Sequence, residues 1–325
     1  MANKAKLSLN KLAMKAVKQL IAESKTLRVQ VHSAKGKPTI IDCGIEVLGS
    51  LEAGRLVAEA CMGGLGTVTF TSMTFDGHYF PAAQVTTDAP ALSCLGAQAA
   101  GWDIKVGNFF ALGSGPARAR ALVENKLFDQ LKYVDAHTEV VLLLETREVP
   151  ALDVCKHIAD VCKIKLENLY LLVAPTACIV GSVQIAARIV ETGIHKLKIL
   201  GFNPNKVLSG TGVCPICPVA RKDMRAMGLT NDAILQMGQT FFYIQSAEDD
   251  DIAALTSKVP SSTSSAYGKP FRQIFKEAGG DFYKIDPGLF APAQITISDL
   301  RSGLVYTAGK PDPELFLKSI SATLA

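Results

Sequence analysis

The sequence contains no uninterrupted apolar run of about 18 residues, the length from which a membrane-spanning helix is suspected. It also lacks a clustered Lys/Arg stripe, because its 34 basic and 30 acidic side chains are dispersed, and this argues against a nucleic-acid partner. The first 21 residues carry positive charge but lack the apolar core and cleavage site of a signal peptide, so they predict an amphipathic helix. We therefore expect a cytoplasmic protein without a membrane partner.

Motifs for metal and nucleotide chemistry are also scarce. Cys214 and Cys217 form a CxxC pair without a second pair or nearby histidines to complete four ligands, so we predict no metal site and eight reduced cysteines. No HExxH occurs, and the histidines are scattered: His32, His78, His137, His157 and His195. There is no P-loop, and residues 113–118 lack the third glycine of a dinucleotide fingerprint, which argues against a nucleotide-binding enzyme.

The length of 325 residues, with 48% hydrophobic and 20% charged side chains, favours two globular domains. We predict a mixed α/β fold with an N-terminal α/β domain at 1–130 and a C-terminal one at 131–325, because 124–138 is a polar interval. Apolar runs predict strands, several of them buried on both faces, at 67–71, 140–144, 169–173, 240–244 and 294–297. Helical patterns lie at 9–24, 51–61, 151–163 and 177–196.

Residues 177–196 form the most regular of these patterns. Its apolar stripe consists of Ile179, Val183, Ala186, Val190 and Ile194. The opposite face carries Gly181, Gln184, Arg188, Glu191 and His195. Arg188 could hold the Glu191 carboxylate ionised and aimed, although this spacing alone favours an ordinary surface ion pair. Gly181 weakens a helix by about 1 kcal/mol relative to alanine, which would make sense if a flat ligand lies against it.

Seven segments, in order and at fitting intervals, resemble the methenyl-tetrahydromethanopterin cyclohydrolases of methanogenic archaea and of bacteria that oxidise formaldehyde. They are residues 41–44, 61–64, 84–88, 113–118, 173–193, 267–271 and 282–292. The resemblance implies a two-domain α/β subunit with a pterin substrate in the cleft between the domains. It also implies a homotrimer without metal, cofactor or prosthetic group.

The resemblance further implies that Arg188 and Glu191 are central to the reaction and that Glu145 belongs to the active site. Glu191 would be the general base for water, an effect of about 10²–10⁴-fold, and Arg188 would keep this carboxylate ionised and oriented. Glu145 and Asp88 are candidates to accept hydrogen bonds from the pterin. Further substrate-binding candidates are Gln184, Gly63, Gly64, Ser114, Arg118 and Lys269. Ordinary turn glycines and solvated basic side chains are the alternatives for most of these.

One position departs from the family pattern: Ala99 stands before Ala100-Gly101-Trp102, where the archaeal pattern has lysine. The missing cation suggests a pterin without the phosphate-bearing tail. A non-catalytic, oligomeric pterin-binding protein remains the competing hypothesis, and the intact Arg188 and Glu191 argue against it.

Overall fold

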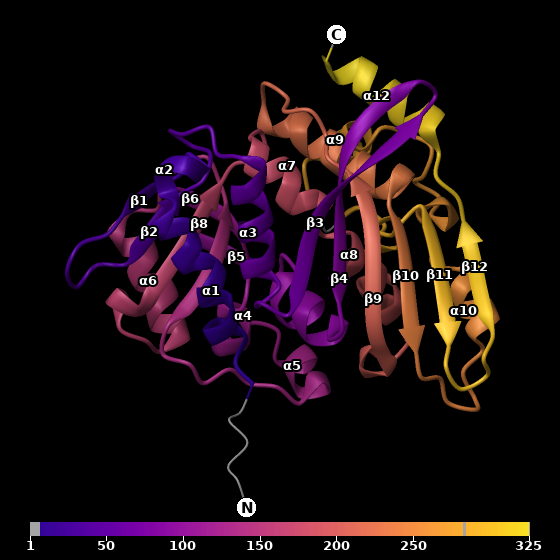
Figure 1. Cartoon of the computed structure of the whole chain (residues 1–325), viewed down its shortest axis with the longest axis horizontal. Helices are drawn as coiled ribbons and strands as arrows, with labels where there is room; N and C mark the ends of the chain where they lie inside the picture. Colours follow the sequence, from indigo (N-terminus) through magenta and orange to yellow (C-terminus); the bar gives the residue numbers. More distant parts are fainter. Residues whose placement is uncertain (1–6, 282–283, 325) are drawn as a thin grey trace, which may run out of the picture.

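The computed structural model describes residues 7–281 and 284–324, which form two six-stranded sheets with helices packed against them (Figure 1). The first sheet has the order β1-β2-β8-β7-β6-β5. Its central strands β2, β8 and β7 run parallel. The bounds are β1 (Gln30–His32), β2 (Thr39–Asp42), β5 (Trp102–Val106), β6 (Phe109–Ser114), β7 (Val140–Glu145) and β8 (Leu169–Ala174).

Helices cover both faces of this sheet. On one face, Val141 and Leu143 of β7 pack against α1 (Leu9–Ala22) and α3 (Leu51–Cys61). On the other face, Leu142 and Leu144 pack against α6 (Leu152–Cys162). Burial on both faces explains why β7 and β8 read as continuous apolar runs. Three short helices complete this part: α2 (Ser24–Leu27), α4 (Ala117–Ala121) and α5 (Asn125–Leu131).

The second sheet has the order β12-β11-β10-β9-β4-β3. Its strands are β3 (Gly66–Phe75), β4 (His78–Thr87), β9 (Val207–Pro215), β10 (Gln239–Ile244), β11 (Gln294–Asp299) and β12 (Val305–Gly309). The helices after β8 are α7 (Ile179–Ala186), α8 (Ile189–Ile199), α9 (Asp223–Met237), α10 (Ile252–Ser257), α11 (Phe271–Glu277) and α12 (Pro313–Leu324). Helix α8 lies close on this sheet, because a Cβ at Gly210 would meet Phe242 and Val190 at 2.8 and 3.0 Å. The hairpin of β3 and β4 reaches α12 (Figure 1), where the rings of Phe80 and Phe316 pack at a tilt with their centroids 5.5 Å apart.

The mixed α/β class and all five predicted strands are confirmed, and the helix predicted at 51–61 coincides with α3. Strand β10 differs in one respect, since its side chains alternate between buried and more exposed positions. The single helix predicted at 177–196 is wrong: α7 ends at Ala186 and α8 begins at Ile189. Phe282 and Tyr283, which open one family segment, lie outside the described residues. No helix among the described residues is both long and apolar enough to cross a bilayer.

The predicted division at residue 130/131 does not separate the two sheets. Strands β3 and β4 come from the N-terminal portion but belong to the second sheet. Strands β7 and β8 follow residue 131 but belong to the first sheet. The chain therefore passes from the first sheet to the second and back before either sheet is complete. A single domain boundary along the sequence cannot separate the two sheets.

Asp232 joins three helices of the second unit and gives a pH-dependent prediction. Its carboxyl accepts hydrogen bonds from Phe271 N (2.9 Å), Gln236 Nε2 (3.1 Å) and the Ser319 hydroxyl. Burial raises the pKa of Asp232 to about 7, although the bonds from Ser319 and Phe271 lower it. Because this pKa is raised above its ordinary value, its stabilising contribution is complete at low pH and is lost as pH rises from about 4 to about 7.

We expect Asp232→Asn to flatten that part of the pH dependence, because an amide keeps the shape and stays neutral. Its oxygen can accept from Phe271 and Gln236, and its nitrogen can donate to the hydroxyl of Ser319. Urea unfolding at a series of pH values between about 4 and 7 measures the effect. An unchanged slope of unfolding free energy against pH in the variant would show that other groups set it.

Candidate active site

The break between α7 and α8 places the arginine and glutamate singled out by the sequence. Arg188 N donates to Ile185 O at 2.9 Å, which closes a tight turn. Arg188 then caps α8, and its carbonyl accepts from Thr192 N (2.8 Å) and Thr192 Oγ1 (3.0 Å). Glu191 follows in the first turn of α8, where the helix dipole favours a negative charge. The two side chains therefore start from a helix end, not from one continuous helix face.

The guanidinium of Arg188 is held by three different elements. It donates from Nη2 to Ser114 Oγ at 2.8 Å, from Nη1 to Gln98 O at 2.7 Å and from Nε to Gln184 Oε1 at 3.2 Å. Ser114 ends β6, Gln98 ends the π-helix η1 (Ala91–Gln98), and Gln184 lies in α7. Three bonds in different directions fix the position of the charge.

The predicted ion pair between Arg188 and Glu191 is not formed within the described residues. A regular helix would bring residues three apart together, but the break at 187–188 removes that regularity. The charge of Glu191 instead acts on two buried neighbours. It adds to the effect of burial, which raises the pKa of Cys94 to about 12. It also opposes burial, which lowers the pKa of Arg118.

Glu145 extends the same network. It stands at the end of β7, paired in register with Ala174 of the parallel strand β8, so the loop after β8 passes beside it. Glu145 accepts from Thr176 Oγ1 at 2.5 Å and from Gln184 Nε2 at 3.4 Å. Gln184 is only 2% exposed and thus connects the Glu145 carboxylate to the Arg188 guanidinium. The structure brings Glu145, Gln184, Arg188 and Ser114 into one connected group.

Arg118 lies in the interior. From the sequence it is expected to be a substrate-binding residue or a solvated surface side chain, and neither expectation predicts burial. It is 0% exposed, donates from Nη1 to Leu95 O (3.1 Å) and Ala97 O (3.2 Å), and pairs with Glu124. Burial lowers its pKa, and the carboxylates of Glu124 and Glu191 act in the opposite direction. Arg118 therefore supports the last turn of η1, the element that supplies Gln98 to the site.

The other predicted residues lie outside this group. Gly63 and Gly64 follow α3 with φ of 64° and 67°, and a Cβ on either would collide with α1, so they fit the turn interpretation. Asp88 is exposed and accepts from Ser209 Oγ at 2.8 Å. Lys269 is 51% exposed and pairs with Glu277 at 2.9 Å.

Gly181 has a local explanation, so the flat ligand inferred against it is not needed. A Cβ at this position would lie 2.3 Å from Pro175 O and 2.6 Å from Thr176 O. The glycine allows the start of α7 to fold tightly back on the preceding loop.

Thr176 and Gln98 were not predicted to belong to the site. Neither shares the helical spacing, although Gln98 stands directly before the departure at Ala99.

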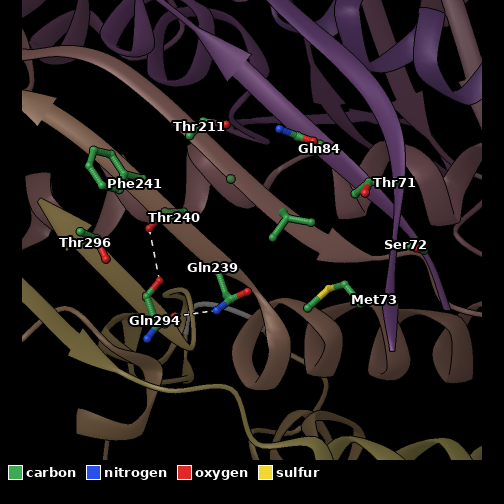
Figure 2. A pocket seen from close by; sticks show the side chains of 12 residues that line it. Thr71, Ser72, Met73, Gln84, Thr211, Gln239, Thr240, Phe241, Gln294 and Thr296 are labelled. Carbon is green, nitrogen blue, oxygen red and sulfur yellow. Dashed lines mark hydrogen bonds between the residues drawn. The ribbon is translucent and has the colours of Figure 1, made fainter. Parts of the chain in front are cut away.

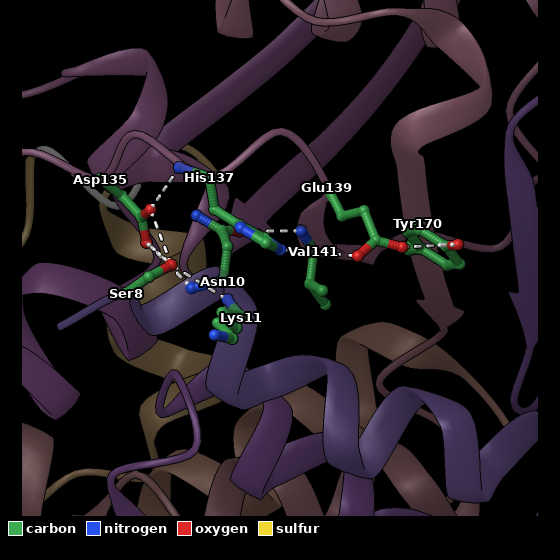
Figure 3. Close-up of polar contacts among 8 residues, drawn as sticks. All are labelled: Ser8, Asn10, Lys11, Asp135, His137, Glu139, Val141 and Tyr170. Carbon is green, nitrogen blue, oxygen red and sulfur yellow. Dashed lines mark hydrogen bonds and ion pairs between the residues drawn. The ribbon is translucent and has the colours of Figure 1, made fainter. Parts of the chain in front are cut away.

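Two cavities lie away from this network. One, of about 490 Å³, is on the outer face of the second sheet (Figure 2), where Gln239 donates to Gln294 at 2.5 Å. The other, of about 260 Å³, is beside the start of α1. Figure 3 shows the adjacent polar cluster, in which Asp135 accepts from Ser8 Oγ and Asn10 N, both at 2.9 Å. These bonds anchor the start of α1 to the segment between α5 and β7.

Among the described residues, no group of three or more His, Cys, Asp or Glu side chains is arranged to hold a metal ion. Cys214 and Cys217 are buried, and burial raises the pKa of both thiols far above the ordinary value. Cys61 lies beside the network of Arg188 and Ser114: burial raises its pKa to about 11, while Arg188 and the Ser114 hydroxyl act to lower it.

Comparison with known proteins adds an independent finding. The family model described as Cyclohydrolase (MCH) matches residues 8–320. The chain is 47% identical over 315 residues to methenyltetrahydromethanopterin cyclohydrolase of Methanothermobacter marburgensis, covering 96% of this chain and 98% of the relative. It is 44% identical over 320 residues to the protein of the same name from Methanocaldococcus jannaschii, covering 98% and 99%. The protein of that name from Methanococcoides burtonii is 39% identical over 313 residues, covering 96% and 98%.

Proposed function

The chain belongs to the Cyclohydrolase (MCH) family, and on that premise we propose that it hydrolyses a methenyl-pterin. The proposed reaction converts the N5,N10-methenyl bridge of (dephospho)tetrahydromethanopterin reversibly to the N5-formyl form. One observation carries the proposal: Arg188 is fixed by Ser114 Oγ and Gln98 O, and Glu191 follows it in the first turn of α8. Both charges act on the buried Arg118, so a positioned cation and a carboxylate lie in the same region.

The first step is the addition of water. The methenyl substrate is an amidinium cation whose bridging carbon is already electrophilic, so we propose that no metal or cofactor takes part. The Glu191 carboxylate accepts one proton of the water as the oxygen bonds to the bridging carbon, and the positive charge of Arg188 keeps that carboxylate ionised and oriented. The product is a neutral carbinolamine, and Glu191 carries the proton.

The second step opens the ring. The bond between the bridging carbon and N10 breaks, and N10 takes the proton that Glu191 holds. The carbinol O–H proton then passes to Glu191 and on to solvent, leaving the formyl C=O on N5. One proton is released per turnover, which balances the positive charge lost by the substrate.

Glu145 is the proposed hydrogen-bond acceptor for the amino and ring N–H groups of the pterin. Each of its oxygens already accepts one bond, from Thr176 or from Gln184. A carboxylate has about four acceptor positions, so both oxygens can accept again. Gln184 and Ser114 hold the surrounding groups in place. Because Ala99 replaces the lysine of the archaeal pattern, we propose a pterin whose tail lacks the phosphate.

We also propose that the enzyme is a cytoplasmic homotrimer, as the family resemblance implies.

The proposed activity is tested with the purified protein and methenyl-tetrahydromethanopterin, by following the loss of the methenyl absorbance. Methenyl-tetrahydrofolate is assayed alongside. Rapid loss with the methanopterin substrate alone supports the proposal. Loss with the folate alone would redirect the substrate assignment, and binding without turnover of either would indicate a non-catalytic pterin-binding protein.

A further inference from the structure

Gln98 contacts both the backbone and the side chain at the break between α7 and α8. Its Nε2 donates to Ala187 O at 3.0 Å, and its backbone O accepts from Arg188 Nη1 at 2.7 Å. In an uninterrupted helix, the carbonyl of residue 187 would accept from the N–H of residue 191. Gln98 therefore supplies a hydrogen bond from another element at the place where the helix stops.

The orientation of the Gln98 amide follows from its partner. A carbonyl oxygen only accepts, so the nitrogen of the amide must be the atom that faces Ala187 O. The Oε1 atom then points into the interior, where no described atom donates to it. Gln98 is 1% exposed, and a buried acceptor without a donor costs stability. An apolar side chain would avoid the unpaired Oε1 but would leave Ala187 O without this donor, so the glutamine here serves the backbone at the break.

The element that carries Gln98 is itself firmly placed. The last turn of η1 is closed by Ala99 N donating to Cys94 O at 2.8 Å. Ala97 O, one residue before Gln98, accepts from Gly115 N at 2.9 Å and from Arg118 Nη1 at 3.2 Å. Gln98 therefore connects the break, and with it Arg188, to an element that is fixed to the segment after β6.

We infer that the Gln98 side chain is a positioning residue for Arg188: by bonding to Ala187 O it sets the backbone turn from which the catalytic guanidinium extends. This inference rests on the proposed function. It assigns Gln98 an effect on turnover through the direction of the Arg188 side chain, without contact between the Gln98 amide and the substrate.

Gln98→Met tests this inference, because methionine has a similar volume and no donor, and the backbone carbonyl that binds Arg188 remains. We expect kcat to fall by roughly 10- to 100-fold, as small misplacements of catalytic groups do, with KM within about 3-fold because the substrate contacts are kept.

Gln236→Met is the matched control. Gln236 is 2% exposed, donates through Nε2 to Asp232 at 3.1 Å and also has an Oε1 without a described donor, but it lies in α9. A kcat loss of the same size in both variants, or an unchanged kcat in Gln98→Met, would overturn the inference.

Gln98→Glu provides a rescue in the same assay. When protonated, the introduced carboxyl can donate to Ala187 O, and when ionised it cannot. The ratio of variant kcat to wild-type kcat should therefore rise as pH falls, and a ratio independent of pH contradicts the inference. If the wild-type protein itself shows no turnover, the proposed function fails, and a crystal structure of Gln98→Met then decides the positioning role alone. Loss of the bond between Arg188 and Ser114 supports that role, and its retention overturns it.

Discussion

Glu191→Gln should lower kcat by about 10²–10⁴-fold, the range contributed by a positioned general base. Glutamine has the same shape as glutamate but cannot accept a proton from water. Glu191 lies in the first turn of α8 and is half-buried, and no described hydrogen bond to it would be lost by the change. We therefore expect the unfolding midpoint to change little and the whole effect to fall on turnover.

The loss of methenyl absorbance under saturating substrate measures this effect, with Glu139→Gln as the control. Glu139 is also a partly exposed carboxylate and accepts from Tyr170 Oη at 3.1 Å, but it precedes β7 at the other end of the strand from Glu145. The control should keep kcat within about 2-fold, as surface changes away from a site usually do. Near-normal turnover in a folded Glu191→Gln protein would remove Glu191 from the mechanism.

The parts of the fold that were predictable are those in which the local pattern and the tertiary structure agree. Strands β7 and β8 are continuous apolar runs because helices cover both faces of their sheet. The membership of β3 and β4 in the second sheet was not predictable from their own residues. The sequence predicted a strand at 67–71 in β3 but none at β4, and the residues of a strand carry no information about which strands pair with it.

The break between α7 and α8 shows the same limit at the site. Ala187 and Arg188 are both good helix formers, and nothing in their neighbourhood signals a stop. At the place where the helix ends, Ala187 O accepts a hydrogen bond from Gln98, a partner 89 positions away. A contact at that sequence distance leaves no periodic signal, so the sequence predicted one helix and an ion pair that the structure does not contain.

For the site itself, helical spacing grouped Gln184, Arg188 and Glu191, and the structure keeps Gln184 and Arg188 in contact at 3.2 Å. Glu145 and Ser114 come from other strands and were accessible only through the family resemblance. Their places follow from the register of β6, β7 and β8. Lys269 and Asp88 were proposed for the charge of their side chains, and no spacing predicted where they would lie. In the structure they pair with Glu277 and Ser209, outside the network.

Arg118→Met should lower the free energy of unfolding by about 2–3 kcal/mol, the cost of leaving buried carbonyls without their donor, whereas the 39% exposed Glu124 can be solvated by water. The guanidinium is 0% exposed, and its loss removes the donors to Leu95 O and Ala97 O and the partner of Glu124. Methionine can fill much of the volume but satisfies none of these groups. Because Leu95 and Ala97 belong to η1, the change should also loosen the element that presents Gln98 to Arg188.

Arg120→Met is the matched control, two residues along the same short helix. Arg120 also donates to two backbone carbonyls, Cys162 O at 2.9 Å and Lys163 O at 3.3 Å, but it is half-buried and has no described carboxylate partner. Its loss should cost about 1 kcal/mol, since water can replace the donor. Urea unfolding of both variants compares the two costs. Equal losses would mean that burial of the Arg118 charge contributes nothing specific, and that η1 is held in place by its own backbone bonds.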